Sequence, residues 1–380
     1  MEIICWRLGM EVTRLQVNNF RNYASSVVEF GAGTNILVGK NAQGKTNLVE
    51  AVLMCSVGRS SRTPRDKELI KWEERRARIK AFTQKREGLG SVEIVIDREE
   101  NKRVAINGLP VSKMGELMGN LSTVFFSPDE LKIVKSSPAD RRRFMDITLC
   151  QLSKTYFYLL SSYNKVLAQR NKLLKSGDVS AIEIWDEQLA TYGAKIARTR
   201  RGFIDRLAVH AKKTHEYLTG GVESLDLSYL GIEGKEVEEI KDNIIFELIR
   251  SREKDFKNGY TNVGIQKDDI MISSGGVDLR TYGSQGQQRT AALSLKLAEI
   301  SIMKDETDEY PVLLLDDVLS ELDTDRQKKL LGAVKGFQTI ITCTHLPKEL
   351  TDTLKDFSLF NVVSGKVTKA QAKREQNGGD

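Results

Sequence analysis

The chain has 380 residues, of which 40% are hydrophobic and 29% charged, and its formal net charge is +6. This balance is typical of a soluble protein, the length predicts two lobes rather than one core, and the basic bias mildly favours polyanionic partners. We find no apolar run of about 18 residues, so no membrane-spanning helix or membrane partner is expected. Four isolated cysteines without a C-x-x-C pair argue against a zinc module and predict a cytoplasmic protein.

Residues 10–137 are predicted to form the first half of an α/β lobe. Residues 1–9 are expected to be an extension before it, because the segment that begins at Met10, MEVTRLQVNNF, fits the start of the fold better than Met1 does. Short strand-like runs alternate in residues 11–38, and a glycine-rich loop follows the third run. The strand-like runs after this loop predict a β-rich flap.

The glycine-rich loop has the spacing G-x-x-x-x-G-K-T and comprises Gly39, Lys40, Asn41, Ala42, Gln43, Gly44, Lys45 and Thr46. Glycines let backbone amides approach phosphate oxygens at a helix N-terminus, the lysine reaches the β- and γ-phosphates, and the threonine hydroxyl is a Mg²⁺ ligand. A glycine-rich turn can also be only a turn. Its position between a strand and a helix nevertheless predicts nucleotide binding.

Residues 138–260 are predicted to form a helical lobe inserted into the nucleotide-binding fold. Apolar residues recur with a period of 3.5 in two runs, from Leu152 to Val166 and from Trp185 to Phe203. This spacing predicts two antiparallel helices that form a short coiled-coil arm, with the second helix about 50 to 60 Å long. An ordinary helical bundle would show a similar seam and stays open as an alternative.

Residues 261–365 are predicted to complete the nucleotide-binding lobe, and residues 366–380 to form a disordered tail. A buried strand in this part ends on Asp316 and Asp317. Two adjacent carboxylates at a strand tip need a cation or a role. Asp316 fits a Mg²⁺ ligand and Asp317 fits the group that orients attacking water, as catalytic residue. A helix cap is the alternative role for such aspartates.

A second helix start with anion-binding character lies some 240 residues after the first. It contains Ser284, Gln285, Gly286, Gln287 and Gln288, and resembles the signature motif that ATPases of the ABC class press onto the γ-phosphate held by a partner subunit. Ser320 and Asp323 then resemble the D-loop, and His345 stands where the switch histidine belongs, although a lone histidine is more often a surface residue.

Together with other segments, these motifs resemble the RecF family, bacterial recombination mediators among the SMC-like ABC ATPases. The resemblance runs from about Met10 to Val363. It includes NNFRNY (18–23), GRSSRTPRDKELI (58–70), SPADRRRFMD (137–146), YGSQGQQRT (282–290), LKLAE (295–299) and LLLDDVLSELD (313–323). The sequence departs from the family in residues 264–269, which read GIQKDD where the family tends to read Gly-Pro-His-Arg-Asp-Asp, and in Asp317, where most ABC ATPases have glutamate.

The resemblance implies an ABC-type P-loop ATPase head that is split in sequence and binds ATP with Mg²⁺. It further implies ATP-dependent homodimerisation on gapped, single-stranded and double-stranded DNA, with slow DNA-dependent ATP hydrolysis used as a switch. Family members act on the nucleoid with RecO and RecR and help RecA displace single-strand-binding protein.

Three basic clusters are candidates for DNA contact, because phosphate contacts need Lys and Arg on one surface. The candidate residues are Arg59, Arg62 and Arg65 in the first cluster, Arg141 and Arg142 in the second, and Arg198, Arg200 and Arg201 in the third. A run of charge is often only the solvated face of a helix. Without a helix-turn-helix or an aromatic array, we expect recognition of backbone and shape rather than sequence.

Two other functions share the nucleotide chemistry. The ATPase subunit of a membrane transporter would not need a helical arm, and its signature normally reads closer to LSGGQ. An SMC-type chromosome-organising head would carry coiled coils of hundreds of residues, whereas the insert here has about 120 residues. ATP-dependent dimerisation on naked DNA, without a membrane partner or a hinge domain, distinguishes the three.

Overall fold

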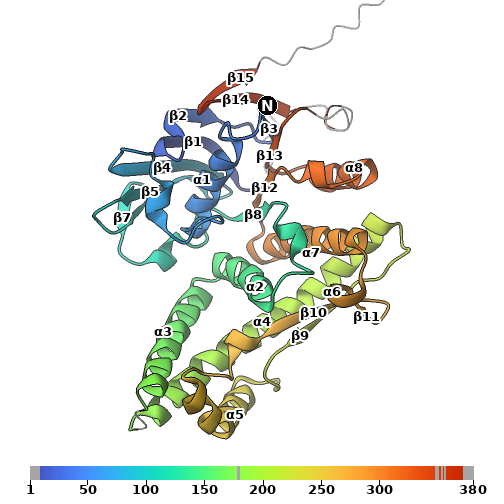
Figure 1. The fold of residues 1–380 in the computed structure, drawn as a ribbon. Helices are drawn as coiled ribbons and strands as arrows, with labels where there is room; N and C mark the ends of the chain where they lie inside the picture. The colour runs from blue at the N-terminus through green and yellow to red at the C-terminus, as the bar shows by residue number, and fades with distance from the viewer. Residues whose placement is uncertain (1–8, 178–179, 347–350, 352–353, 355–356, 371–380) are drawn as a thin grey trace, which may run out of the picture. The chain divides into compact units, whose positions relative to one another are not determined.

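The computed structural model describes residues 9–177, 180–346, 351, 354 and 357–370 (Figure 1). The chain forms two compact units: residues 1–130 with 303–380 make unit 1, and residues 131–302 make unit 2. This division differs from the expected one, because residues 261–302 group with the helical insert. The expected extension, residues 1–8, and residues 371–380 of the expected tail lie outside the described residues.

The mainly parallel sheet of unit 1 carries the glycine-rich loop. Its strands follow the order β15-β14-β3-β13-β12-β8, in which only β15 is antiparallel to its neighbour. The bounds are Thr34–Val38 (β3), Thr123–Phe126 (β8), Val312–Asp316 (β12), Thr339–Cys343 (β13), Phe357–Val363 (β14) and Lys366–Ala370 (β15). Every residue of β12 and β13 is buried, so these two strands lie in the core.

Strand β15 corrects the expectation of a disordered tail from residue 366 onward. Residues 366–370 pair with β14 in an antiparallel hairpin, and Ser364 and Gly365 form its turn with positive φ angles of 47° and 73°. The polar sequence of this segment conceals the strand, because the pairing with β14 rather than a buried apolar face holds it in place.

The second sheet of unit 1 is antiparallel and corresponds to the expected β-rich flap. Its order is β2-β1-β4-β5-β6-β7. The bounds are Glu11–Phe20 (β1), Tyr23–Glu29 (β2), Arg76–Lys85 (β4), Gly88–Asp97 (β5), Arg103–Ile106 (β6) and Leu109–Val111 (β7). Inward residues alternate along β4, as a sheet with one buried face requires.

The helices of unit 1 are α1 (Lys45–Val57), α8 (Thr324–Ala333) and the 3₁₀ turns Asp66–Leu69, Met114–Leu117 and Leu319–Glu321. A further 3₁₀ turn, Glu130–Lys132, spans the boundary to unit 2. Helix α1 is buried on nearly all sides, so it needs no amphipathic pattern. It follows β3 after the glycine-rich loop and packs against β12, β13 and β8 of the mainly parallel sheet and against β4 and β5 of the antiparallel sheet.

Unit 2 consists of helices with a small sheet of order β11-β10-β9. Its elements are α2 (Pro138–Leu152), α3 (Lys154–Ser176), α4 (Ile182–Thr219), β9 (Asp226–Leu230), α5 (Val237–Asn258), the 3₁₀ turn Ile265–Lys267, β10 (Asp269–Ser274), β11 (Val277–Asp278), α6 (Leu279–Tyr282) and most of α7 (Gln285–Thr307). Among the described residues, none of the helices combines the length and apolar character that a membrane crossing requires.

Helices α3 and α4 pack against each other, as the apolar seam predicts. Helix α4 has 38 residues, which corresponds to about 57 Å. Helix α5 also packs along α4, so the pair forms part of a three-helix assembly. Gly193 permits this packing, since a Cβ atom there would lie 3.2 Å from both Tyr163 and Ile244.

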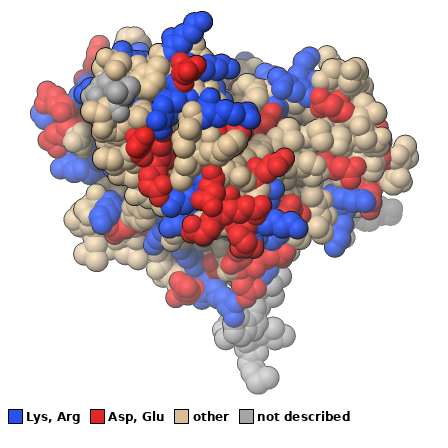
Figure 2. Space-filling view, turned by 90° about the horizontal axis from the view of Figure 1, so that it is seen from below, with Lys and Arg blue, Asp and Glu red and all other residues tan. Residues whose placement is uncertain are grey.

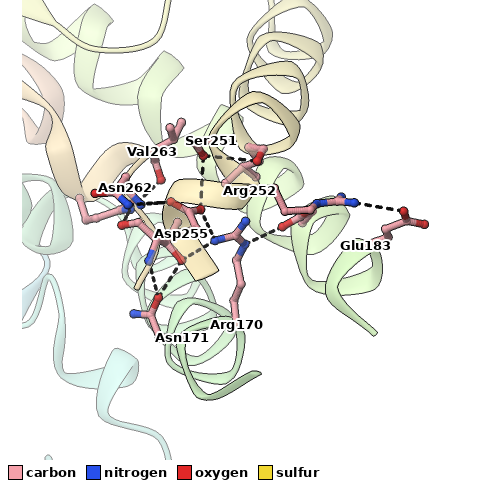
Figure 3. Close-up of polar contacts among 12 residues, drawn as sticks. Arg170, Asn171, Glu183, Ser251, Arg252, Asp255, Asn262 and Val263 are labelled. Atoms are coloured by element: carbon pink, nitrogen blue, oxygen red, sulfur yellow. Dashed lines mark hydrogen bonds and ion pairs between the residues drawn. The ribbon is translucent and has the colours of Figure 1, made fainter. Parts of the chain in front are cut away.

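Three fully buried arginines tie the elements of unit 2 together: Arg141, Arg170 and Arg200. Arg170 of α3 donates hydrogen bonds to Asp186 of α4 at 2.5 Å and to Asp255 of α5 at 2.7 Å (Figure 3). One guanidinium therefore joins three helices. Removing it would leave the buried Asp255 without a cation and Asp186 with only the half-buried Arg252.

Candidate functional site

The glycine-rich loop forms the turn between β3 and α1, where the sequence predicts it. Gly44 has a φ angle of 118° and Ala42 one of 64°, so two residues of the turn have positive φ angles. A Cβ atom on Gly39 would lie 2.3 Å from the carbonyl oxygen of Val362. Only glycine fits at that position, and the backbone amides that follow it lead into the N-terminus of α1.

Residues from two distant segments brace the loop. Asn22 donates to the carbonyl oxygen of Gln43 at 2.9 Å, and the Tyr23 hydroxyl donates to that of Gly44 at 3.0 Å. From the β14–β15 turn, the amide of Ser364 donates to the Gln43 side chain at 2.7 Å. The sequence analysis gave these residues no role, although NNFRNY was noted as a family segment. They fix the loop before any ligand arrives.

Lys45 bends back over the loop. Its Nζ atom donates to the carbonyl oxygens of Gly39 at 2.6 Å and Lys40 at 3.0 Å. The side chain is 7% exposed. The ammonium group therefore lies beside the loop backbone, within the turn that a phosphate would enter.

Thr46 and Asp316 meet at the carboxyl-terminal edge of the parallel strands. The Thr46 hydroxyl donates to Asp316 Oδ1 at 2.9 Å, and the Thr342 hydroxyl donates to the same oxygen at 2.8 Å. Burial raises the pKa of Asp316 and the neighbouring Asp317 adds to this shift, while the two hydroxyl groups oppose it. A buried carboxylate beside a hydroxyl supplies the oxygen ligands that Mg²⁺ prefers, and Mg²⁺ typically needs only one or two protein ligands. These residues fit the ion.

Asp317 follows in the left-handed region with a φ angle of 54°. Its amide donates to the Thr342 hydroxyl at 3.0 Å, and its carbonyl oxygen accepts from Ser320 at 2.7 Å. Unusual backbone conformations of this kind concentrate at functional sites. The bonds fix the backbone of Asp317 and leave its carboxylate at the carboxyl end of β12.

Two further candidates lie on the segments after β12 and β13. His345 is exposed, and its Nδ1 atom lies 3.1 Å from the Thr344 hydroxyl. Asp323 is the N-cap of α8, and its carboxylate accepts from the amide of Arg326 at 2.9 Å. The contacts of Asp323 are therefore those of a helix cap, and its role on the D-loop stays a prediction.

The start of α7 in unit 2 carries the signature-like residues. The amide of Ser284 donates to Gln287 Oε1 at 3.0 Å, and the amide of Gln287 donates to Ser284 Oγ at 3.2 Å, which is a reciprocal capping box. Ser284 and Gln285 are exposed, and Gly286 is half-buried. Gln288 is buried and donates to the carbonyl oxygen of Leu279 at 2.8 Å. The Gln288 amide therefore contacts the backbone of α6, and its contact with a nucleotide stays a prediction.

Two of the expected DNA contacts are wrong. Arg141 is 1% exposed and pairs with both carboxylate oxygens of Asp269, at 2.6 and 2.8 Å. Arg200 is 2% exposed and pairs with Asp268 at 2.7 Å and Asp146 at 2.9 Å. Burial keeps both guanidinium groups from a DNA backbone. The two aspartates of the GIQKDD segment thus serve to neutralise buried arginines.

Two more residues that were expected to contact DNA already donate hydrogen bonds to the backbone of this chain. Arg142 donates to the carbonyl oxygen of Asp268 at 2.7 Å, and Arg201 donates to that of Ile232 at 2.6 Å. The Arg201 guanidinium also lies over the ring of Tyr229. These two side chains are half-buried and have less freedom to reach a phosphate than the sequence suggests.

Four expected DNA contacts are exposed: Arg59, Arg62 and Arg65 in unit 1, and Arg198 in unit 2. Arg62 donates to Asn47 of α1 at 3.0 Å, so its cluster touches the helix of the glycine-rich loop. Figure 2 shows one face of the chain, on which basic side chains are interspersed with acidic ones that gather near its centre. The net positive charge therefore forms no continuous basic surface on that face.

A bidentate ion pair that the sequence analysis missed links this cluster to the loop-bracing segment. Arg21 pairs with Glu50 of α1 through two bonds of 2.9 Å, and Glu50 also accepts from Ser60. Ser60 in turn accepts from the amides of Arg62 and Thr63. The opposite charges of Arg21, in the NNFRNY segment, and of Glu50, in the helix after the loop, are the signal that could have revealed it.

The comparisons agree with this arrangement. The family model described as "RecF/RecN/SMC N terminal domain" matches residues 11–366. Proteins named "DNA replication and repair protein RecF" are 44% identical in Clostridium tetani, over 94% of this chain and 99% of that protein, and 44% identical in Alkaliphilus oremlandii, over 94% and 100%. The structure titled "recombination mediator protein RecF-ATP in RecFOR pathway" is 36% identical, with a TM-score of 0.90 over 97% of this chain and 100% of that chain.

An Smc head domain from Pyrococcus furiosus has a TM-score of 0.57 and 16% identity, which shows a shared fold alone. The fold and the family model define the class: this is an ATPase head of the SMC-like ABC type with a helical insertion. Within that class, the identity over nearly the whole length to several relatives shows that the chain belongs to the RecF family.

Proposed function

We propose that this chain is an ATP-dependent DNA-binding protein of recombinational repair and replication restart. The observation that carries the proposal is the 2.9 Å hydrogen bond between Thr46 and Asp316, which joins the glycine-rich loop to the tip of β12. The relatives named DNA replication and repair proteins, and the RecF-ATP structures titled as part of the RecFOR pathway, support it.

In this proposal, residues 39–46 bind the phosphates of ATP. The loop amides surround the β-phosphate, Lys45 exchanges its carbonyl partners for β- and γ-phosphate oxygens, and Thr46 and Asp316 hold Mg²⁺. The ion supplies charge neutralisation at the phosphates. Asp317 orients the attacking water, and His345 lies on the segment after the neighbouring strand, from which it would contact the γ-phosphate.

The start of α7 would complete the site of a second copy of the chain. Ser284, Gln285 and Gly286 are the accessible members of the signature, and a helix N-terminus attracts an anion. A phosphate loop and a signature that act in different copies require a head-to-tail pair with two composite sites. ATP would thus drive dimerisation, with Ser320 and Asp323 on the D-loop between the two sites.

Hydrolysis would be slow and would reset the dimer, so that ATP acts as a switch. Asp317 is one methylene shorter than the glutamate usual in ABC ATPases and reaches water less well. The weak ATPase activity would depend on DNA, because DNA holds the two copies together.

DNA contact would come from the exposed basic residues. Arg59, Arg62 and Arg65 lie beside α1, and Arg198 lies on α4 with the exposed Lys195, Lys212 and Lys213. Gapped, single-stranded and double-stranded DNA share the phosphate backbone that such residues bind. RecR and RecO would be direct partners and RecA a functional one, in the cytoplasm on the nucleoid.

The test is sedimentation of the purified chain with ATP or ADP, with and without gapped DNA. We expect dimers with ATP and not with ADP, and more dimers when DNA is present. A chain that stays monomeric with ATP and DNA would overturn the proposal. An SMC-type chromosome-organising head is the alternative, since the fold is shared, and it would need a hinge domain to join two heads.

A further inference from the structure

Glu223 lies in the short turn between α4 and β9. Helix α4 ends at Thr219, and Gly220 and Gly221 follow with φ angles of 69° and 81°. The Thr219 hydroxyl donates to the carbonyl oxygen of His215 at 2.8 Å and lies 3.4 Å from that of Glu223. These features reverse the chain at the end of the long helix and bring Glu223 to the first turn of α7.

The carboxylate of Glu223 contacts side chains from two helices. Gln287 Nε2 of α7 donates to Oε1 at 3.1 Å. His215 Nε2 of α4 lies 3.5 Å from Oε2, and His215 Nδ1 lies 2.9 Å from the hydroxyl of Ser294. His215 is fully buried, and burial lowers its pKa while Glu223 opposes the shift. The carboxylate thus bridges the last turns of α4 and the signature-like start of α7.

The contact with Glu223 sets the orientation of the Gln287 amide. Gln287 Oε1 must face the amide of Ser284 to complete the capping box, and its NH₂ group must then face the other way. A carboxylate only accepts hydrogen bonds, so Glu223 selects this orientation and rejects the flipped one. Without Glu223, the two orientations of the amide compete and the cap loses one of its two bonds in the flipped state.

The cap in turn sets the geometry of Ser284. Ser284 Oγ accepts from the amide of Gln287, so the hydroxyl proton remains available for donation. Ser284 is exposed at the N-terminus of α7, where an anion is favoured.

We propose that Glu223 is a positioning residue for the signature motif, which orients Gln287 so that Ser284 meets the γ-phosphate bound by a second copy of this chain. The inference rests on the proposed function, because it assumes that the start of α7 acts on the nucleotide of a partner. It adds a residue at the end of α4 that lies outside the signature segment itself.

The test compares Glu223→Ala, Glu223→Gln and the control Glu253→Ala, which removes an exposed carboxylate from α5. Glu223→Ala should bind ATP as a monomer with unchanged affinity and dimerise with ATP about tenfold more weakly, the factor expected for losing one hydrogen bond to a charged group. Glu223→Gln keeps an acceptor for Gln287 but adds a donor that also tolerates the flipped amide, so its dimerisation should fall between that of Glu223→Ala and that of the unmodified chain. The control should match the unmodified chain.

A role limited to holding the charge of His215 predicts a different pattern. Glu223→Gln would then be as defective as Glu223→Ala, and this result would overturn the inference. The double variant Glu223→Ala with Gln287→Ala gives a second measurement, since residues acting through one another are not additive. We expect the double variant to dimerise like Gln287→Ala alone, and additive losses would contradict the proposal.

The dimerisation measurements distinguish a failure of the proposed function from a failure of the role of Glu223. If the unmodified chain does not dimerise with ATP, the proposed function is overturned and this inference with it. If the unmodified chain dimerises and Glu223→Ala dimerises equally well, only the role of Glu223 is overturned.

Discussion

The hydroxyl of Thr46 donates to the carboxylate of Asp316, which lies 270 residues further along the chain, at a distance of 2.9 Å. Strands β3, β13 and β12 are neighbours in one parallel sheet, so their carboxyl ends meet at one edge. The helical insert lies between the two residues in sequence and leaves this pairing intact. A site that needs both residues therefore forms only when the two halves of unit 1 come together.

The first prediction concerns the loop lysine. Lys45→Ala should abolish ATP-driven dimerisation and ATP-stimulated DNA binding, because Lys45 supplies the ammonium group beside the loop backbone. Sedimentation with ATP measures the first effect and a DNA titration with ATP the second. Lys335→Ala, which removes an exposed lysine of unit 1 outside the loop, serves as the control. Normal dimerisation by Lys45→Ala would refute the phosphate-loop assignment.

The second prediction separates the two aspartates at the tip of β12. Asp317→Asn should bind ATP normally and accumulate dimers, because Asp316 keeps its bonds to Thr46 and Thr342 while the water-orienting carboxylate is lost. The measurements are the dimer fraction and the rate of phosphate release. Asp316→Asn should instead weaken Mg²⁺-dependent nucleotide binding. Failure of Asp317→Asn to dimerise would mean that Asp317 belongs to binding and not to hydrolysis.

The third prediction concerns the buried arginine of the helical unit. Arg170→Leu should lower the free energy of unfolding of unit 2 by about 3–5 kcal/mol, because Asp255 then stays buried without its cation and Asp186 keeps only the half-buried Arg252 (Figure 3). Arg252→Ala removes the half-buried arginine that also pairs with Asp186, and should cost about 1 kcal/mol or less.

Denaturation followed by the fluorescence of Trp185, which lies in α4, reports on unit 2. Trp6 and Trp72 are the other tryptophans of the sequence and would be replaced by phenylalanine. Adding Asp186→Asn and Asp255→Asn to Arg170→Leu should recover part of the lost stability, because the uncompensated charges are removed. Equal losses for Arg170→Leu and Arg252→Ala would contradict the difference in burial.

The corrections to the expected DNA contacts share one physical cause. A basic residue has the same appearance in a sequence whether water or a distant carboxylate surrounds it. Arg141 pairs with Asp269, 128 residues away, and Arg200 pairs with Asp268, 68 residues away. By contrast, the turn at residues 39–46 and the strand that ends at Asp316 depend on local spacing, and the sequence predicts their form. Contacts between residues that are distant in sequence, such as Asn22 with Gln43, can be identified only from the tertiary structure.

The fourth prediction applies these corrections to DNA binding. Lys195, Arg198, Lys212 and Lys213 are exposed on α4, and a period of 3.6 residues brings them to one side of the helix. If each neutralises one phosphate, replacing all four by alanine should reduce the slope of log K against log salt by about 3.6, at about 0.9 per contact.

Nucleotide affinity should not change in this variant, because the four residues belong to unit 2 and the phosphate loop to unit 1. Lys254→Ala with Lys257→Ala, which removes two exposed lysines from α5, is the control for a general loss of charge. An unchanged slope in the α4 variant would mean that these residues form only a solvated helix face and do not contact DNA.

The last prediction tests whether the signature acts on a partner. Ser284→Arg should bind ATP as a monomer and fail to dimerise, because a bulky side chain then occupies the N-terminus of α7. A mixed dimer of Ser284→Arg and Lys45→Ala chains has two composite sites. One combines both lesions, and the other pairs an intact phosphate loop with an intact signature. The mixture should therefore hydrolyse ATP at one site although each variant alone is inactive. If the mixture is inactive yet crosslinks as heterodimers with ATP, both sites must act together; if no heterodimers form, the signature does not act on a partner and the proposed dimer is wrong.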